Sequence, residues 1–480
     1  MAMRKHQLFA RRTKIVCTLG PASSSSTIIE RLIRSGMNVA RLNLSHGTPP
    51  DHEHIVTNVR RVAGRLGLPV AVLMDLPGPK YRTGPLQGGS VVLHKGAQVV
   101  LTTRPVEGNA QEVPVNLPTL PRDVQVGDSV LLDDGAMQLK VQRTSGSEVV
   151  CRVIEGGTLT PGRGVVVPGM QTRGPFLTPH LKEHLEFAIA QQPDYLALSF
   201  VSQAKDIEEV RDLLRRRGSD LPMIAKIERG RALDHLDEIL QASDGIMVAR
   251  GDLGVDIPLE QLPIVQKDII RRCNRRDKPV ITATQMLESM VTAARPTRAE
   301  VTDVANAIFD GTDAVMLSAE TSIGKHPVQA VAMMAKIAST TEAQLPHEHL
   351  LQERSMALGP QIDTAISYDA CRTAHQLGAK AIVAFTESGS TAIWVSKCRP
   401  KVPILALTSS ELVSRRLQLC WGIQVCQVVE PSSVEALFEL GAKFSKSLGL
   451  AKAGDLVVIT AGIPLGITGT TNLLKVEKIA

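Results

Sequence analysis

Eight short apolar runs recur between residues 13 and 320, and helical stretches such as Ser23–Ser35 and Lys205–Arg217 lie between most neighbouring runs. Near-continuous apolar runs of this kind are typical of parallel strands that are covered on both faces. Eight strand–helix units predict a (β/α)₈ barrel. The strands are expected at Thr13–Gly20, Met37–Leu44, Pro69–Leu76, Tyr195–Val201, Met223–Glu228, Gly245–Leu253, Pro279–Met286 and Ala314–Glu320.

A stretch of different composition interrupts this alternation after the third strand. Gly84–Gly174 is rich in Gly, Pro and Val, and Asp128–Val141 alternates like a hairpin around Asp134-Gly135. We interpret residues 80–175 as a small β-barrel lid domain, inserted between the barrel segments 1–79 and 176–345.

A new alternation begins after a predicted linker at His347–Gly359, and it indicates a C-terminal doubly wound α/β domain over residues 346–480. Its expected elements are a helix at Thr364–Leu377 and strands at Ala381–Phe385, Ile404–Leu407, Gln424–Val429 and Leu456–Thr460.

Composition excludes several classes of protein. Only 3% of the 480 residues are aromatic, so stacking platforms for nucleic acid are scarce. The net charge of +6 is not gathered into one block, which favours pockets for small anions over a nucleic-acid groove. The sequence contains no apolar run long enough to span a membrane, and its seven cysteines are scattered. We therefore expect a cytoplasmic protein that binds neither nucleic acid nor membranes.

Charged and polar residues gather where the predicted strands end, which is where barrel enzymes carry their active sites. Lys226 and Glu228 lie two apart on one strand and so share a face. The pair alone fits either a structural ion pair or a catalytic site. Asp252 on the next strand adds a second carboxylate, and such oxygens suit Mg²⁺ or Mn²⁺. The other candidates at strand ends are Arg41, Asn43, Ser45, His46, Asp75, Lys80, Arg82, Ser199, Gly251 and Thr284.

Two permanent cations, Arg41 and Arg82, belong to this set, and guanidinium groups suit phosphate. Two arginines, a lysine, a metal and a threonine hydroxyl indicate phosphoryl transfer, in which the protein supplies positioning and charge stabilisation.

A second candidate phosphate site lies in the C-terminal domain, between a predicted strand and a helix. Hydroxyls and a glycine at a helix N-terminus could cradle phosphate, although an ordinary capped helix start fits equally well. The candidate residues are Thr386, Ser388, Gly389, Ser390 and Thr391.

The chain resembles the pyruvate kinase family, of the bacterial type, over nearly its whole length. The stretches that carry the resemblance are Thr13–Pro21, Ala40–Gly47, Ala225–Glu228, Val248–Gly254, Ile281–Met290 and Pro296–Glu320. The resemblance implies transfer of a phosphoryl group from phosphoenolpyruvate to ADP, giving pyruvate and ATP in the last step of glycolysis. It also implies Mg²⁺, replaceable by Mn²⁺, a homotetramer, and a C-terminal domain that binds an allosteric effector.

The resemblance assigns roles residue by residue. Glu228 and Asp252 would bind Mg²⁺, and Lys226 would stabilise the transferring phosphoryl group. Arg41 and Arg82 would hold phosphates, and the backbone of Gly251 with Asp252 and Thr284 would bind the substrate carboxylate. The nucleotide would lie near Asn43, His46, Arg82 and Arg163.

The chain departs from the family pattern in two places. Arg229 stands where many members have Asn, and no consequence for the chemistry is expected. Members that need K⁺ carry Thr, Lys and Glu where this chain has Leu76, Pro77 and Lys80. We therefore expect no K⁺ requirement.

The Lys80 ammonium is expected to fill a monovalent-cation pocket made by Asn43, Ser45 and Asp75. Glu387 within the C-terminal cradle would repel a bisphosphate, which favours a sugar monophosphate or AMP as effector.

Two other functions stay open on the sequence. A Mg²⁺-dependent aldolase or lyase of 2-oxo acids would explain Arg41, Glu228 and Asp252, but not the inserted domain. A catalytically inactive effector-binding homologue would not need the intact set of Lys226, Glu228, Asp252 and Thr284.

Overall fold

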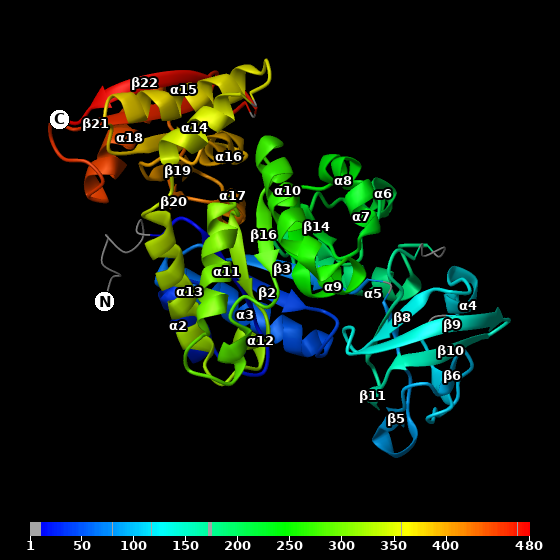
Figure 1. Cartoon of the computed structure of the whole chain (residues 1–480). Helices are drawn as coiled ribbons and strands as arrows, with labels where there is room; N and C mark the ends of the chain where they lie inside the picture. Colours follow the sequence, from blue (N-terminus) through cyan, green and yellow to red (C-terminus); the bar gives the residue numbers. More distant parts are fainter. Residues whose placement is uncertain (1–10, 79, 117, 171–174, 357, 468) are drawn as a thin grey trace. The chain divides into compact units, whose positions relative to one another are not determined.

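The computed structural model describes residues 11–78, 80–116, 118–170, 175–356, 358–467 and 469–480 (Figure 1). Eight strands form a closed barrel in the order β1-β17-β16-β15-β14-β13-β3-β2, which confirms the predicted (β/α)₈ architecture. Their bounds are β1 Lys14–Thr18, β2 Val39–Asn43, β3 Ala71–Leu76, β13 Tyr195–Leu198, β14 Met223–Ile227, β15 Gly245–Ala249, β16 Val280–Ala283 and β17 Ala314–Leu317.

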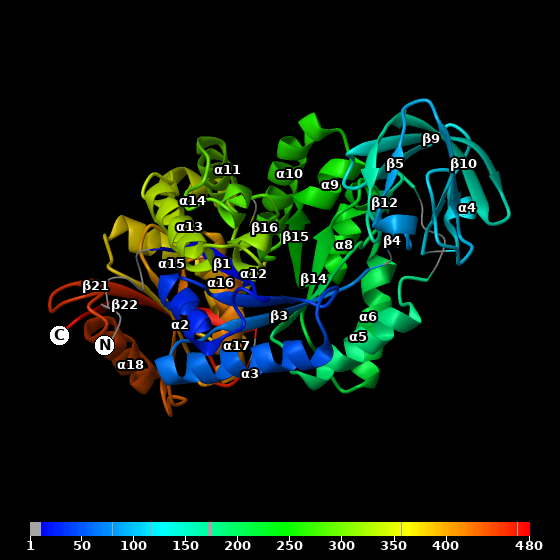
Figure 2. The ribbon, with the colours of Figure 1, turned by 90° about the horizontal axis from the view of Figure 1, so that it is seen from below.

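The barrel strands are buried along their length, as their apolar composition predicts. β14 and β15 run side by side and parallel, with Lys226 opposite Met247 (Figure 2). The main barrel helices are α2 Ser26–Ser35, α3 Pro49–Leu66, α5 Pro179–Ala190, α6 Ala204–Arg216, α8 Leu236–Ala242, α10 Leu262–Arg275, α11 Arg298–Phe309 and α13 Pro327–Glu342, with shorter helices α7 Arg231–Asp234 and α12 Ala319–Ser322.

Local sequence explains where these helices begin. Thr297 caps α11, accepting a hydrogen bond from the Glu300 backbone, and the Glu300 side chain accepts one from the Thr297 backbone in return. This reciprocal capping box satisfies two of the N–H groups that a helix start leaves without partners.

Several sequence predictions about individual elements were wrong. The strands predicted at Tyr195–Val201, Pro279–Met286 and Ala314–Glu320 each end three residues earlier than predicted. The strand predicted at Gly245–Leu253 ends at Ala249, and helix α9 Arg250–Asp256 follows at once. Leu253 is fully buried as a helix residue, so the apolar pattern continues past the end of the strand. The predicted linker His347–Gly359 contains helix α14 His347–Ser355.

The insertion after β3 is a β structure with its own hydrophobic core, rich in Val and Leu. The predicted hairpin is present as β8 Ser129–Leu132 and β9 Met137–Ser145, and its turn places Asp133, Asp134 and Gly135 at positive φ. The sheet runs β4-β12-β8-β9-β10-β6-β7, beside a β11-β5 pair. The other bounds are β4 Tyr81–Arg82, β5 Val91–Leu93, β6 Gln98–Thr102, β7 Glu112–Pro114, α4 Leu120–Asp123, β10 Glu148–Glu155, β11 Gly157–Leu159 and β12 Gly164–Val166.

The C-terminal segment forms a five-stranded sheet in the order β20-β19-β18-β21-β22. Its two faces carry separate apolar clusters, one under α15, α16 and α17 and the other under α18, which confirms the doubly wound prediction. β22 is antiparallel to β21 and was not predicted. The bounds are α15 Ile362–Gln376, β18 Ile382–Phe385, α16 Ser390–Lys397, β19 Ile404–Thr408, α17 Glu411–Arg416, β20 Ile423–Gln427, α18 Val434–Ser447, β21 Leu456–Gly462 and β22 Thr471–Lys478.

The chain groups into two compact units. One comprises the residues up to 74 with 190–196 and 270–480, and the other comprises 75–189 and 197–269. These units do not coincide with the four predicted segments, whose boundaries stay a prediction. No helix in the described part of the chain combines the length and apolarity needed to cross a membrane.

Candidate active site

Lys226, near the end of β14, lies at the centre of a buried polar cluster. Its ammonium donates to the Ser199 hydroxyl at 2.7 Å and to a carboxylate oxygen of Asp75 at 3.1 Å. It also forms an ion pair with Glu228 at 3.0 Å, and Ser199 donates to Asp75 at 3.2 Å. One cation therefore lies against two carboxylates contributed by different strand ends.

Glu228 is 3% exposed and accepts a hydrogen bond from the backbone N–H of Phe200 at 2.6 Å. Burial raises the pKa of Glu228. The positive charge of Lys226 opposes that rise, and the negative charges of Asp252 and Asp75 add to it. A carboxylate beside two others gains from a neighbouring cation, and the Lys226 ammonium supplies one.

The loop after β3 approaches the end of β13 very closely. Phe200 has a φ of 60°, a left-handed conformation that is rare for a bulky residue. A Cβ on Gly78 would lie 2.4 Å from the Ser199 carbonyl oxygen and 2.8 Å from the Phe200 ring. Only glycine fits at position 78. The tight packing holds the Phe200 N–H in place, and this N–H donates a hydrogen bond to Glu228.

Asp252 lies in the first turn of α9, where the helix dipole is positive and favours anionic groups. Its carboxylate pairs with the ammonium of Lys80. The Lys80 ammonium and the Arg229 guanidinium lie 5.4 Å and 5.3 Å from the centre of the Phe200 ring. Lys80, Phe200, Glu228, Arg229 and Asp252 line one pocket, together with Tyr81, Val165, Val166, Val167, Met170 and Asp256.

Arg82 and Arg163 lie on neighbouring chain segments of the insertion. β4 pairs with β12, which begins directly after Arg163, and Arg82 is opposite Gly164. The Arg82 guanidinium donates to the Gly162 carbonyl at 2.9 Å, and Arg163 pairs with Asp133 at 3.2 Å. The Arg163 side chain is half exposed.

Gly251 lies in α9, in the same compact unit as Lys226, whereas Arg41, Asn43, Ser45, His46 and Thr284 belong to the other unit. Arg41 is buried at the middle position of β2 and donates to the Thr18 hydroxyl at 2.8 Å. The Asn43 side chain accepts from the Ser45 backbone at 3.2 Å, which turns the chain toward exposed His46.

Thr284, directly after β16, has a φ of 68°, and its hydroxyl donates to the Ala283 carbonyl at 2.6 Å. A β-branched residue at positive φ is strained, and strain of this kind clusters at functional sites.

The structure therefore brings Asp75, Lys226, Glu228 and Asp252 together within one unit, and the roles of these residues stay a prediction. The sequence prediction overlooked Phe200, whose backbone N–H contacts Glu228. Nothing in its side chain indicates that role, but its place directly after Ser199 at a strand end could have done so. Lys80 pairs with Asp252, whereas the sequence prediction placed it in a cation pocket made by Asn43, Ser45 and Asp75. That pocket stays a prediction.

Comparison with known proteins agrees with this architecture. The pyruvate kinase barrel-domain family matches residues 10–331, and the pyruvate kinase alpha/beta-domain family matches residues 364–477. The chain is 46% identical over 473 residues to a pyruvate kinase of Geobacillus stearothermophilus, which covers 98% of this chain and 81% of that protein. It is 45% identical over 471 residues to a pyruvate kinase of Staphylococcus aureus, covering 98% and 80%.

A solved structure is similar over its full length. The crystal structure of a pyruvate kinase from Cryptosporidium parvum superimposes with a TM-score of 0.93, at 34% identity and with 100% of both chains covered. The two family matches and the similarity to these relatives define an enzyme of the phosphotransferase class. The chain belongs to the pyruvate kinase family.

Proposed function

We propose that this enzyme transfers the phosphoryl group of phosphoenolpyruvate to ADP, giving pyruvate and ATP. The observation that carries the proposal is the buried Lys226 ammonium, which lies within 3.1 Å of Ser199, Asp75 and Glu228. A fixed cation in a water-poor site stabilises charge that develops on a transferring phosphoryl group. Family membership supplies the reaction, and the cluster supplies the group that promotes it.

Glu228 and Asp252 would hold Mg²⁺, or Mn²⁺ in its place. Two carboxylates fit Mg²⁺, which usually takes one or two from the protein and completes its shell with water and substrate oxygens. Glu228 also lies near the negative charges of Asp252 and Asp75, which a bound cation would offset. Bound Mg²⁺ would neutralise phosphate charge and polarise the substrate oxygens.

The other residues would bind and orient the two substrates. Arg41 and Arg82 would hold phosphate groups, since guanidinium forks suit phosphate oxygens. The Gly251 backbone, Asp252 and Thr284 would bind the carboxylate, with Thr284 near the carbon that gains a proton. Asn43, His46, Arg82 and Arg163 would contact the nucleotide.

Lys80 would replace K⁺. Its ammonium already lies among the site's carboxylates through its pair with Asp252. A tethered ammonium can supply the charge that Asn43, Ser45 and Asp75 would otherwise receive from a bound monovalent cation.

The C-terminal domain would bind a phosphorylated effector and activate the enzyme, which would act as a homotetramer. A pocket of about 590 Å³ includes the predicted cradle residues Thr386, Ser388, Ser390 and Thr391. Gly389 has a φ of 96° at the start of α16, and its N–H donates to the Thr386 hydroxyl at 2.9 Å. Glu387 and Glu430 also line the pocket, and their charge favours a monophosphate over a bisphosphate.

One coupled assay tests the proposal. ADP-dependent formation of pyruvate from phosphoenolpyruvate, followed through NADH and lactate dehydrogenase, is expected with Mg²⁺. An enzyme that cleaves 2-oxo acids without ADP would instead support the aldolase or lyase reading. A folded protein with neither activity would refute the proposal.

A further inference from the structure

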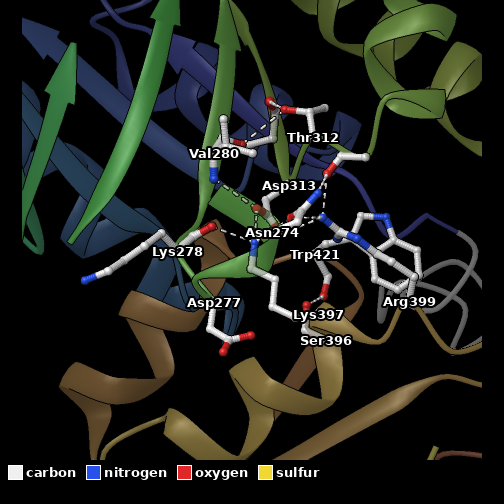
Figure 3. Close-up of polar contacts among 12 residues, drawn as sticks. Asn274, Asp277, Lys278, Val280, Thr312, Asp313, Ser396, Lys397, Arg399 and Trp421 are labelled. Carbon is white, nitrogen blue, oxygen red and sulfur yellow. Dashed lines mark hydrogen bonds and ion pairs between the residues drawn. The ribbon is translucent and has the colours of Figure 1, made fainter. Parts of the chain in front are cut away.

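Strand β16, which leads to Thr284, is fixed at its start by the buried carboxylate of Asp313 (Figure 3). Asp313 directly precedes β17, and its carboxylate accepts the Val280 N–H at 2.9 Å. Its own N–H donates to the Val280 carbonyl at 3.0 Å, and Lys397 donates to the carboxylate at 2.6 Å. β16 and β17 then pair in parallel. The strand that precedes Thr284 is therefore held against β17 from its first residue.

The chain leaves β16 through two strained residues. Thr284 has a φ of 68° and Gln285 has a φ of 54°, so two successive residues other than glycine are left-handed. Thr284 is β-branched, and in such a residue this conformation is a genuine outlier. Backbone strain persists only where the surrounding structure holds the chain in place. Contacts beyond Gln285 must therefore hold this segment.

Glu320, in helix α12, supplies such a contact. It lies three residues after the end of β17 and is 1% exposed. One of its carboxylate oxygens accepts the N–H of buried Leu287 at 3.1 Å, and the other accepts the N–H of Ser318 at 2.6 Å. A single buried side chain therefore connects the segment that follows β16 to the end of β17.

Helix α12 is itself anchored on the chain around β1. The Thr321 hydroxyl donates to the Thr18 carbonyl at 2.8 Å, and Ala22 donates its N–H to the Ser322 carbonyl at 2.9 Å. The backbone of this helix is therefore fixed, so a change in the Glu320 side chain acts on the contacts of its carboxylate.

Both oxygens of the Glu320 carboxylate are acceptors, which this arrangement requires. Burial raises the pKa of Glu320, and its hydrogen bonds with backbone N–H groups oppose that rise. Glutamine has nearly the same shape, but it offers one acceptor oxygen and one donor NH₂ group. A Glu320→Gln variant therefore keeps one backbone contact and loses the other.

We propose that Glu320 is a positioning residue that holds Thr284 in place for the protonation of the enolate. This role rests on the proposed function, in which Thr284 lies near the carbon that gains a proton. After the phosphoryl group has left, the enolate oxygen becomes the keto carbonyl, and the electron pair of the carbon–carbon double bond takes up a proton supplied by water. The methyl group of pyruvate results. Phosphoryl transfer precedes this step and is assigned to Lys226, so loss of a Glu320 contact should slow protonation alone.

Two rates measured on one preparation of Glu320→Gln separate the two steps. Formation of ATP from phosphoenolpyruvate and ADP, followed with luciferase, reports phosphoryl transfer. Exchange of the pyruvate methyl protons with D₂O, followed by ¹H NMR with Mg²⁺ and inorganic phosphate, reports the proton step in reverse. A positioned acid or base contributes about 10²-fold or more, so we expect the ratio of exchange to ATP formation to fall about tenfold or more. A loss of folded enzyme lowers both rates equally and leaves this ratio unchanged.

Glu300→Gln is the matched control. Glu300 also accepts backbone N–H groups, from Ser289 and Thr297 at 2.7 Å each, but it contacts the chain beyond Leu287. This variant should leave the ratio unchanged. Glu320→Asp, which keeps the charge but is one methylene shorter, should lower the ratio and tests the same contact if Glu320→Gln does not fold.

A double variant tests whether Glu320 acts through Thr284. Thr284→Ala should lower the ratio, and Glu320→Gln should lower it no further in that background, because the effects of residues that act as a unit do not add. An unchanged ratio in both Glu320 variants, an equal fall in Glu300→Gln, or a further fall in the double variant would overturn the role of Glu320. A wild type that forms neither ATP nor pyruvate would instead refute the proposed function.

Discussion

Replacing Lys226 with Met tests whether the buried ammonium is the group that stabilises the transferring phosphoryl group. Met preserves the length and the apolar stem of the side chain but removes the charge. The ammonium's hydrogen bonds to Ser199 and Asp75 and its ion pair with Glu228 are lost together. Glu228 and Asp252, the proposed metal ligands, remain in place.

Two magnitudes follow from this geometry. Removing one partner of a buried ion pair leaves an uncompensated charge and costs about 3–5 kcal/mol of stability. Loss of a preorganised charge at the reacting group lowers turnover by about 10²–10³. Because both proposed metal ligands survive, we expect the Mg²⁺ concentration for half-maximal activity to change little.

The assay measures kcat across a Mg²⁺ titration, and urea unfolding followed by circular dichroism measures stability with and without Mg²⁺. Added Mg²⁺ should restore part of the lost stability, because it neutralises Glu228 in place of the ammonium. Lys182→Met, at an exposed position on α5, is the control and should behave like the wild type. A Lys226→Met enzyme with near-normal kcat would refute the assigned role.

Three further predictions concern other residues. In a buffer of bulky organic cations, KCl should not activate the wild type but should activate the Lys80→Glu variant. Strong K⁺ activation of the wild type would contradict the role of Lys80. Ribose 5-phosphate, glucose 6-phosphate or AMP should lower the half-saturating phosphoenolpyruvate concentration more than fructose 1,6-bisphosphate does, and the reverse order would show that Glu387 does not set the preference. Burial lowers the pKa of Lys14 to about 7, so the folded state binds fewer protons than the unfolded state above that pH, and stability should rise between pH 7 and pH 10. Urea unfolding at several pH values checks this rise, which Lys14→Met should abolish.

The strands of the barrel could be predicted because burial on both faces leaves a continuous apolar run. Their ends could not, because the residues that follow are also buried for other reasons. Leu253 is apolar as part of a helix, and Glu320 is buried because its carboxylate accepts the Leu287 and Ser318 N–H groups. β22 was missed because an edge strand of mixed burial has neither a continuous nor an alternating apolar pattern.

The candidate site could be predicted where chemistry depends on side-chain type. Lys226, Glu228 and Asp252 stand out because charges at strand ends are costly without a role. Phe200 contributes through its backbone N–H, and the strain at Thr284 comes from its positive φ. The type of side chain at these two positions therefore does not predict either feature. Asp194, Asp244 and Asp313 each stand directly before an apolar strand and accept a backbone N–H of a neighbouring strand, so this contact does have a sequence signal.

The pairing of β1 with β17 has a consequence for how the chain matures during synthesis. Lys14 is the register partner of Ala314 in the parallel pair of β1 and β17, so the barrel joins residues 300 positions apart. The barrel cannot close until β17 has left the ribosome. The inserted β structure has its own core and lies wholly between these two strands in the sequence. Domains fold as units while translation proceeds, so the insertion is complete while the first three barrel strands still wait for their partners. During that interval the first three barrel strands lack the partners that they have in the closed barrel.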